Sequence, residues 1–176
     1  ALLPTTQISI PVNKENAVKY GIVSPEDAPY MEDSLHITIG RPNRGYSIDK
    51  KTLAFLDFLS NYQWDRPIHF GIGGAGNPSE NMFGLQKYLV MEGLTYKLVP
   101  LDINNLEACD GQRTYDLAMP EWEYGGMDNP KTYLSEADRR TASHVRSALN
   151  AATRSLLMDG DTTRARELIN LSVQKM

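Results

Sequence analysis

Alternating apolar and polar residues predict two β-strands near the start of the chain. Residues 7–12 (QISIPV) and 34–40 (SLHITIG) combine this alternation with β-branched side chains, which favours half-buried strands. The stretch between them, VSPEDAPYMED, contains prolines and acidic residues and is predicted to be a loop. The turn-forming stretch GRPNRGY follows the second strand, so the chain is expected to reverse or change direction there.

Helical and strand patterns then alternate through the middle of the chain. Ser47 is placed to cap a helix over 48–61, in which Leu53, Phe55, Leu56 and Leu59 form an apolar stripe. The pattern predicts a strand over 66–72, a helix over 80–94 that ends at Gly93, and a strand over 95–101. This order predicts an α/β fold with a small mixed or parallel sheet and crossover helices.

The C-terminal third of the chain predicts a helical hairpin. Ser135 is expected to cap a helix that ends at Gly160, and its apolar positions recur at helical spacing at Val145, Ala148, Leu149, Ala152 and Leu156. Asp161 is expected to cap a second helix with an apolar face of Ala165, Leu168, Ile169 and Val173. The pair has the length of one tetratricopeptide unit. One such unit leaves an apolar face uncovered, so it should pack on the α/β body or continue into further residues.

These patterns divide the chain into two parts. Residues 1–130 are predicted to form an α/β module, and residues 134–176 a tetratricopeptide-like helical hairpin packed on it. Residues 102–133 lose clear periodicity and carry many turn-forming residues, so they are predicted to be a long irregular connection.

Composition narrows the classes of function. The 176 residues carry 18 basic and 22 acidic side chains, and the basic residues are scattered, which argues against a nucleic-acid partner. The longest apolar stretch, LAFLDFL, is too short to span a bilayer, so no membrane insertion by these residues is expected. The one cysteine, Cys109, has no partner for an internal disulfide and is interpreted as a small, partly buried residue.

A glycine-rich segment supports one alternative function, nucleotide binding. Gly71, Gly73 and Gly76 follow a predicted strand in G-x-G-x-x-G spacing, and Asp102 follows the next strand, as in dinucleotide-binding folds. However, Pro78 removes an amide donor close to the expected phosphate position, and Glu80 would repel a phosphate. These features favour a glycine-rich turn, and a nucleotide-binding α/β domain is kept as the alternative.

A second candidate site lies in the segment EWEYGGMD. Trp122 and Tyr124 stand beside acidic residues that include Asp128, a combination of flat apolar faces and hydrogen-bond acceptors that suits a carbohydrate. The competing interpretation is that both aromatic rings anchor a long loop to the body of the protein. The histidines His36, His69 and His144 show no metal-ligand spacing, so neither a metal nor a cofactor is predicted. His36 and His69 both fall in predicted strands; one interpretation has them facing one another, and the favoured interpretation is that they are packed or surface residues.

Two longer segments carry a family resemblance. NYQWDRPIHF and YLVMEGLTYKLVP are the most specific, and ISIPVNKENAVKYGIV and EWEYGGMDNPKTYLSEADRR extend it over nearly the whole chain. Together they resemble the soluble C-terminal region of a bacterial family of multi-pass membrane proteins, formerly of unknown function and related to protein O-mannosyltransferases. That region closes in tetratricopeptide-like helices. Where the family has a short link, this chain carries GIGGAGNPSENM, which suits a tolerated loop better than a phosphate site.

The resemblance implies an accessory role. The chain would be a non-catalytic, extracytoplasmic module of a membrane glycosyltransferase, periplasmic in a bacterium and tethered by the parent protein. Its partners would be the rest of the parent protein and an acceptor protein or glycan. The family's catalytic acid lies in the membrane part, so no catalytic residue transfers to this sequence. A general protein-interaction module, with the helical hairpin offering a groove to a peptide, is a further alternative.

Overall fold

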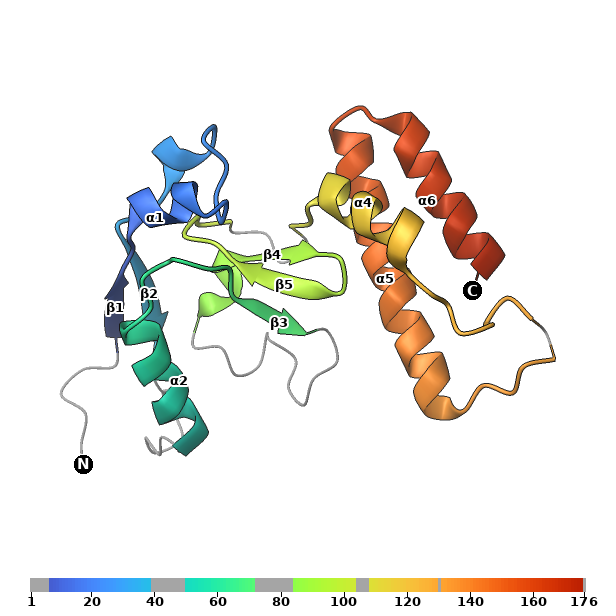
Figure 1. The fold of residues 1–176 in the computed structure, drawn as a ribbon, viewed down its shortest axis with the longest axis horizontal. Helices are drawn as coiled ribbons and strands as arrows, with labels where there is room; N and C mark the ends of the chain where they lie inside the picture. Colours follow the sequence, from blue (N-terminus) through green and yellow to red (C-terminus); the bar gives the residue numbers. More distant parts are fainter. Residues whose placement is uncertain (1–6, 39–49, 72–83, 104–107, 130, 176) are drawn as a thin grey trace. The chain divides into compact units, whose positions relative to one another are not determined.

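A computed structural model describes residues 7–38, 50–71, 84–103, 108–129 and 131–175 of the chain (Figure 1). The chain divides into two compact units. The first consists of Ala1–Ile68, Pro78–Leu89 and Leu98–Leu106, and the second of His69–Asn77, Val90–Lys97 and Glu107–Met176.

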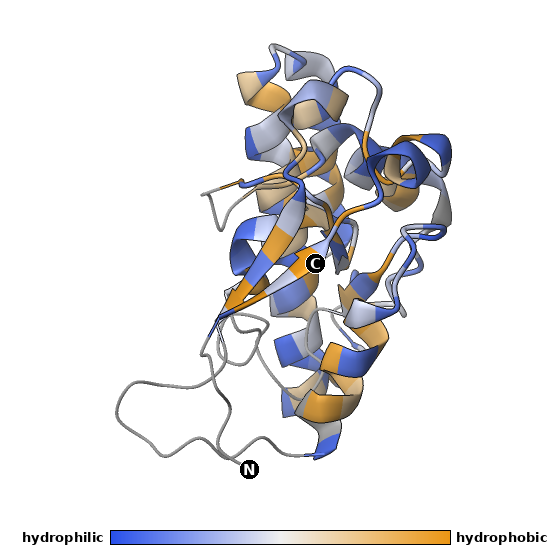
Figure 2. Ribbon diagram, turned by 90° about the vertical axis from the view of Figure 1, so that its left-hand side faces the viewer, coloured by the Kyte–Doolittle hydropathy of each residue, from blue (hydrophilic) through white to orange (hydrophobic). Residues whose placement is uncertain are grey.

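The first unit begins with the two expected strands. β1 (Gln7–Pro11) and β2 (Ser34–Thr38) pair antiparallel, with Ile8 opposite Ile37. Their alternation places Leu35 and Ile37 in the core and leaves the intervening residues more exposed. Figure 2 colours the chain by hydropathy and shows hydrophilic and hydrophobic residues alternating along the strands. The connection contains helix α1 (Lys14–Lys19), capped by Asn13, and the 3₁₀ turn η1 (Ala28–Tyr30).

Helix α2 and the turn η2 complete the first unit. α2 (Lys50–Ser60) lies within the predicted helix 48–61 and contacts β1, whereas its expected cap, Ser47, lies outside the described residues. The 3₁₀ turn η2 (Leu85–Tyr88) packs on β2, where the Tyr88 hydroxyl donates to Glu32 at 2.5 Å and accepts from the His36 amide at 3.1 Å. The largest fully buried side chains of this unit are Trp64, Tyr88, Leu35, Ile37, Leu59, Leu85 and Leu98.

A three-stranded sheet has most of its residues in the second unit. β3 (His69–Gly71), β5 (Thr95–Leu98) and β4 (Leu89–Glu92) lie in the order β3-β5-β4. The predicted helix over 80–94 is wrong for its described part, because η2 and β4 occupy it and Gly93 forms the turn of the β4–β5 hairpin. The apolar run LVM is short and is followed by Glu92 and Gly93, a pattern that fits a short strand as well as a helical turn.

Three helices form the rest of the second unit. α5 (Glu136–Met158) and α6 (Thr162–Lys175) make the predicted hairpin, and α4 (Gly111–Glu121) packs on both (Figure 1). The apolar stripe predicted on α5 is buried. α4 lies inside the stretch 102–133, where the sequence pattern predicted irregular structure, and it supplies the cover that the hairpin was expected to need.

The apolar face predicted for α6 is only partly correct. Ala165 and Leu168 are buried, but Ile169 and Val173 are 47% and 77% exposed. The buried row continues instead through Ser172, which follows Ala165 by seven residues and Leu168 by four. The apolar stripe of α6 is therefore wider than the surface that α4 and α5 cover, and only one side of the stripe is buried.

The predicted fold class is confirmed: strands and helices mix in an α/β chain that ends in a helical hairpin. The expected mixed or parallel sheet with crossover helices is corrected, since β1 with β2 and β3 with β5 pair antiparallel. Among the described residues, a parallel contact occurs as an isolated bridge between Met91 and Cys109. The predicted division into an α/β module over 1–130 and a tetratricopeptide-like hairpin over 134–176 stays a prediction.

Candidate functional site

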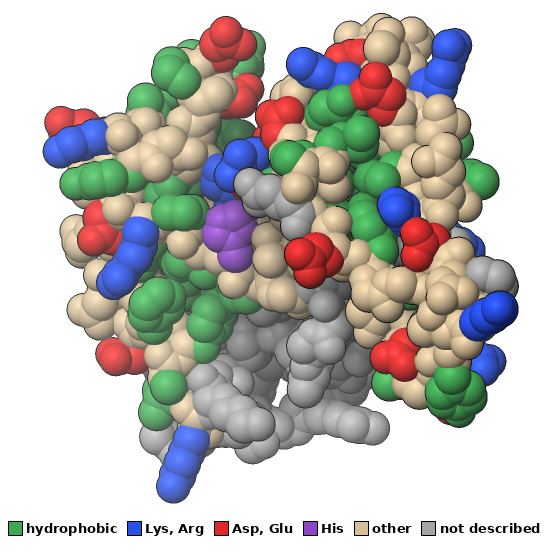
Figure 3. Space-filling view, turned by 45° about the vertical axis from the view of Figure 1, so that its right-hand side comes forward, with side chains coloured by type: hydrophobic (Ala, Val, Ile, Leu, Met, Phe, Trp, Pro, Cys, Tyr) green, Lys and Arg blue, Asp and Glu red, His purple; other side chains and the backbone are tan. Residues whose placement is uncertain are grey.

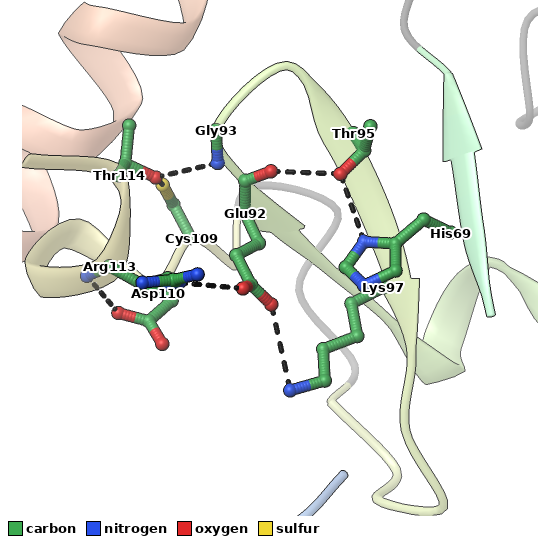
Figure 4. A network of polar contacts seen from close by, with 9 residues as sticks. All are labelled: His69, Glu92, Gly93, Thr95, Lys97, Cys109, Asp110, Arg113 and Thr114. Atoms are coloured by element: carbon green, nitrogen blue, oxygen red, sulfur yellow. Dashed lines mark hydrogen bonds and ion pairs between the residues drawn. The ribbon is translucent and has the colours of Figure 1, made fainter. Parts of the chain in front are cut away.

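The carboxylate of Glu92 ties the three-stranded sheet to α4 (Figure 4). Its oxygens lie 3.5 Å from Nζ of Lys97 on β5 and 3.2 Å from Nε of Arg113 on α4. The side chains of Glu92 and Lys97 are only 13% and 19% exposed, so removal of either charge would weaken a pair that is mostly shielded from water. This pairing holds the β4–β5 hairpin at a defined position on α4.

The tip of that hairpin is fixed by a second set of contacts. Gly93 adopts a φ of +62°, which a side chain would strain, and its amide donates to the hydroxyl of the buried Thr114 at 2.9 Å. The Thr95 hydroxyl donates to the Glu92 carbonyl at 2.9 Å and lies 3.0 Å from Nδ1 of His69. These bonds leave the next residue, Leu94, at the tip with 36% of its surface exposed.

Leu94 and the first half of α5 enclose an open hollow, which we call the hairpin groove. Its volume is about 540 Å³, and its lining consists of Leu94, Glu136, Ala137, Arg140, Thr141, His144 and Val145. The six helical residues form two neighbouring rows at spacing i, i+4, which places each row along one edge of the helix. One row carries Glu136, Arg140 and His144, and the other carries Ala137, Thr141 and Val145.

The start of α5 is held by a capping box. The Ser135 hydroxyl accepts from the Asp138 amide at 3.2 Å, and the Asp138 carboxylate accepts from the Ser135 amide at 2.9 Å. Hydrogen bonds from Ser135 lower the pKa of Asp138 from its ordinary value. Arg140 pairs with Glu136 at 2.8 Å along the helix. The charged row of the groove is therefore built on an ordered helix terminus.

The groove combines two kinds of surface. Leu94, Ala137 and Val145 offer apolar contact, and Thr141, His144 and Arg140 offer hydrogen-bonding groups beside it. Acidic and basic side chains also lie interspersed on the face that Figure 3 presents, so charges of both signs are available to a partner there. Such a combination suits a polypeptide segment that inserts an apolar side chain and bonds through its backbone.

The structure places the predicted carbohydrate-binding residues around the helical core of the second unit. Trp122 and Tyr124 are half-buried and pack against this core, and Trp122 lies beside Gly93. The Tyr124 hydroxyl is buried without a hydrogen-bond partner among the described residues. Asp128 pairs with Lys175 of α6 at 3.2 Å. These contacts support the anchoring interpretation, and carbohydrate binding by the three residues stays a prediction.

The described residues of the predicted nucleotide site do not have the structure that a dinucleotide-binding fold requires. Gly73 and Gly76 lie outside the described residues, and Gly71 ends β3. From Gly84 onward the described chain forms η2 and β4, where the fingerprint requires a continuing helix. Asp102, the expected ribose ligand, lies 3.0 Å from Nζ of Lys87 in an ion pair. The strand that carries Gly71 also pairs antiparallel, unlike the strands of that fold.

The histidines have separate surroundings. His36 lies opposite Ser9 on the outer face of β1–β2, with Nδ1 3.2 Å from the Ser9 hydroxyl, whereas His69 contacts Thr95 in the other sheet. His144 lines the hairpin groove, a role that spacing along the sequence did not reveal. Within the described residues, no three His, Cys, Asp or Glu side chains gather as a metal site.

Burial keeps several reactive groups protonated. It raises the pKa of the Cys109 thiol to about 11, and it raises the pKa of the Tyr62 hydroxyl to about 12. Burial also raises the pKa of Tyr96 and Tyr124. Because the thiolate or phenolate is the nucleophilic form, these side chains are poor nucleophiles near neutral pH.

Sequence reasoning missed the hairpin groove because its two sides are about forty residues apart in the chain. The one local signal was the i, i+4 repetition of polar residues at the start of α5, which reads as an ordinary solvated helix face. Leu94 gave no signal, since it sits in a stretch that was predicted to be helical.

The comparisons with known proteins give a family and nothing further. No curated protein and no solved structure matches the chain. In the part of the chain that the structure describes, every helix is too short or too polar to cross a lipid bilayer. The family described as TMEM260-associated domain 2 matches residues 1–116, which include β1 through the first half of α4. The chain therefore belongs to the TMEM260-associated domain 2 family.

Proposed function

We propose that this chain is a non-catalytic accessory module of a membrane glycosyltransferase related to the protein O-mannosyltransferases. The module faces the extracytoplasmic side, the periplasm in a bacterium, and its hairpin groove holds a segment of the acceptor protein. Membership in a family of TMEM260-associated domains supports the link to a membrane protein. The single observation that carries the binding role is the groove between Leu94 and the start of α5.

The groove's chemistry favours an acceptor polypeptide over a glycan. An inserted aliphatic side chain would remove Leu94 and the apolar row of α5 from water, and burying one such side chain contributes about 1.5–3 kcal/mol. A sugar would be held chiefly by planar polar groups and an aromatic face, and among the described residues the groove lining includes no Phe, Tyr or Trp. Arg140 and His144 are placed to bond carbonyl oxygens of the acceptor backbone.

The non-catalytic role is supported by the state of the buried nucleophiles. Cys109 has a pKa raised to about 11, and its sulfur lies beside the Thr114 hydroxyl at 3.8 Å instead of a base. The ion pairs of Glu92 join β4 to β5 and α4, and the Asp110 carboxylate caps α4 by accepting from the Arg113 amide, so both groups have structural contacts. Chemistry is accordingly assigned to the membrane part of the parent protein.

The test uses the parent membrane protein and a sugar-transfer assay. Leu94→Asp places a charge in the groove beside Glu136, so the KM for the acceptor should rise about tenfold, as loss of about 1.4 kcal/mol of binding implies. The kcat at saturating acceptor and the KM for the sugar donor should stay unchanged, because the groove contributes only acceptor binding.

A matched control comes from the other end of the same helix. Leu157 is 50% exposed on α5 and outside the groove, so Leu157→Asp should leave both KM values unchanged. An unchanged acceptor KM in Leu94→Asp contradicts the groove assignment. Sugar transfer by the isolated 176-residue chain, or a parent reading frame without multiple apolar segments of about 20 residues, contradicts the accessory role.

A further inference from the structure

A second hollow lies in the first unit, where α2 ends; we call it the α2 pocket. Its volume is about 400 Å³, within the size range of small-molecule sites. Its lining consists of Ala54, Asp57, Phe58, Asn61, Tyr62, Gln63, Asp65 and Arg66. None of these residues belongs to the hairpin groove, so the two sites are made of different residues in different units.

An ordered aromatic surface forms one wall of the α2 pocket. Phe58 is 45% exposed, and its ring stacks on Tyr62 with centroids 6.2 Å apart and planes inclined by 21°. Tyr62 in turn contacts Trp64, with centroids 4.8 Å apart, and Trp64 is fully buried. The stack links the exposed Phe58 ring to the core and limits its freedom. Phe58 therefore presents a pre-positioned apolar face at the edge of the pocket.

The backbone at the pocket is strained. Trp64 adopts a φ of +58°, and within the described residues it is the one non-glycine in the left-handed region. For a bulky residue this conformation costs about 1–3 kcal/mol and persists only where surrounding contacts enforce it. Here the enforcing contacts are full burial of the indole and its Nε1 donating to the Pro11 carbonyl at 3.4 Å. Strain of this kind concentrates at ligand sites.

The left-handed turn determines what surrounds Phe58. With Trp64 directed inward, its neighbours Gln63 and Asp65 are both exposed and both line the pocket. The side-chain amide of Asn61 is oriented by donating to the backbone carbonyl of Asp57 at 2.8 Å. The side-chain amide of Gln63 donates to the backbone carbonyl of Asn61 at 3.3 Å. The rim thus offers planar amides and carboxylates at the edge of an aromatic face.

The rim of the pocket carries charged groups of both signs. Arg66 lies 3.9 Å from Asp65, and Asp57 is the remaining carboxylate of the lining. An anionic ligand would meet two carboxylates, and a cationic ligand would meet the guanidinium. Planar amides, carboxylates and a guanidinium are suited to bonding adjacent hydroxyl groups through two atoms at once. A neutral polyhydroxylated ligand with one apolar face satisfies all of these groups.

We propose that the α2 pocket binds a neutral pyranose, stacked on Phe58 and hydrogen-bonded by the side chains of Asp57, Asn61, Gln63 and Asp65. This inference goes beyond the acceptor-binding role of the hairpin groove and does not depend on it. The C–H face of the pyranose covers the Phe58 ring, and its hydroxyl groups replace the water that these polar side chains otherwise bind.

Saturation-transfer NMR on the full 176-residue chain tests the proposal. The probes are methyl pyranosides of glucose, mannose, galactose and N-acetylglucosamine, with methyl glucuronide as the charged counterpart and glycerol as the control for non-specific contact. At least one neutral pyranoside should receive saturation, strongest at its ring C–H protons. Phe58→Ala and Asn61→Ala should each weaken its binding at least tenfold, and glucuronide should bind more weakly than the matching neutral sugar.

Control variants separate this site from the others. Leu53 lies on α2 outside the pocket lining and is 61% exposed, so Leu53→Ala should leave sugar binding unchanged. Leu94→Asp should also leave it unchanged, which distinguishes failure here from failure of the hairpin groove. The amide spectrum of each variant checks folding, and Gln63→Ala replaces any variant that fails. The proposal is overturned if no neutral pyranoside receives saturation, if the signal survives Phe58→Ala, or if glucuronide binds best.

Discussion

Gly111, the first residue of α4, lies where that helix crosses α5, and a methyl group there would collide with the neighbouring helix. A Cβ built on Gly111 would lie 2.8 Å from the Ala152 carbonyl oxygen and 2.9 Å from Cβ of Ser155. The carbonyl belongs to the backbone of α5 and cannot rotate away. Gly111→Ala must therefore push the two helices apart.

The expected cost follows from these contacts. Overpacking of this kind costs about 1–3 kcal/mol, whereas the lower entropy of the unfolded alanine chain returns about 0.4–1 kcal/mol. The displacement also weakens two hydrogen bonds of the Ser155 hydroxyl, which accepts from the Gly111 amide at 3.3 Å and donates to the Cys109 carbonyl at 2.8 Å. We expect a net destabilisation of about 1–2 kcal/mol, which is a factor of roughly 5–30 in the folded-to-unfolded ratio.

Hydrogen exchange measured by mass spectrometry localises the effect. The slowest amides of α4 and α5 should exchange roughly 5–30 times faster in Gly111→Ala, because the opening equilibrium of the second unit shifts by that factor. Gly71→Ala is the matched control, since a Cβ at Gly71 meets no atom within 4 Å and its φ lies outside the left-handed region. Unchanged protection in Gly111→Ala would refute the close approach of α4 to α5.

Four further predictions concern single groups. Burial raises the pKa of Cys109 from 9.0 to about 11, so as pH rises the unfolded chain loses this proton before the folded one does. The stability that the buried thiol contributes is complete below pH 9 and falls between pH 9 and 11. In urea titrations, Cys109→Ala should therefore lose less stability over this alkaline range than the wild-type chain. Ser135→Ala removes the capping box of α5 and should lower the free energy of unfolding by about 1 kcal/mol in the same titration. An unchanged free energy would show that the cap does not stabilise the fold. Saturating ATP or NAD should leave the melting temperature unchanged, since Asp102 is engaged by Lys87, and a rise of several degrees would restore the nucleotide alternative. If Trp122 binds a sugar, Trp122→Ala should abolish a glycan-induced change in fluorescence while the amide spectrum keeps its dispersion; an unchanged response would leave only the anchoring interpretation.

Prediction from the sequence succeeded where the signal was local. Ser135 and Asp161 were identified as helix caps, and both side chains accept from the amide three residues onward. The alternation in β1 and β2 and the helical spacing in α5 likewise depend on residues close together in the chain. The segment 85–92 failed because its short apolar run is compatible with either structure, and the choice depends on pairing with β5 and on contacts of the buried Tyr88.

The sequence by itself determined the positions of most strands, the two C-terminal helices and their caps, and the membership of residues 1–116 in a TMEM260-associated family. Tertiary structure alone decided that the strands pair antiparallel, that α4 covers the hairpin, and that Leu94 reaches the start of α5. It also decided the left-handed conformation of Trp64 that shapes the α2 pocket. The physical reason is that caps and periodicities are set by neighbouring residues, whereas pairing direction, covered faces and strain are set by the free energy of contacts between distant ones.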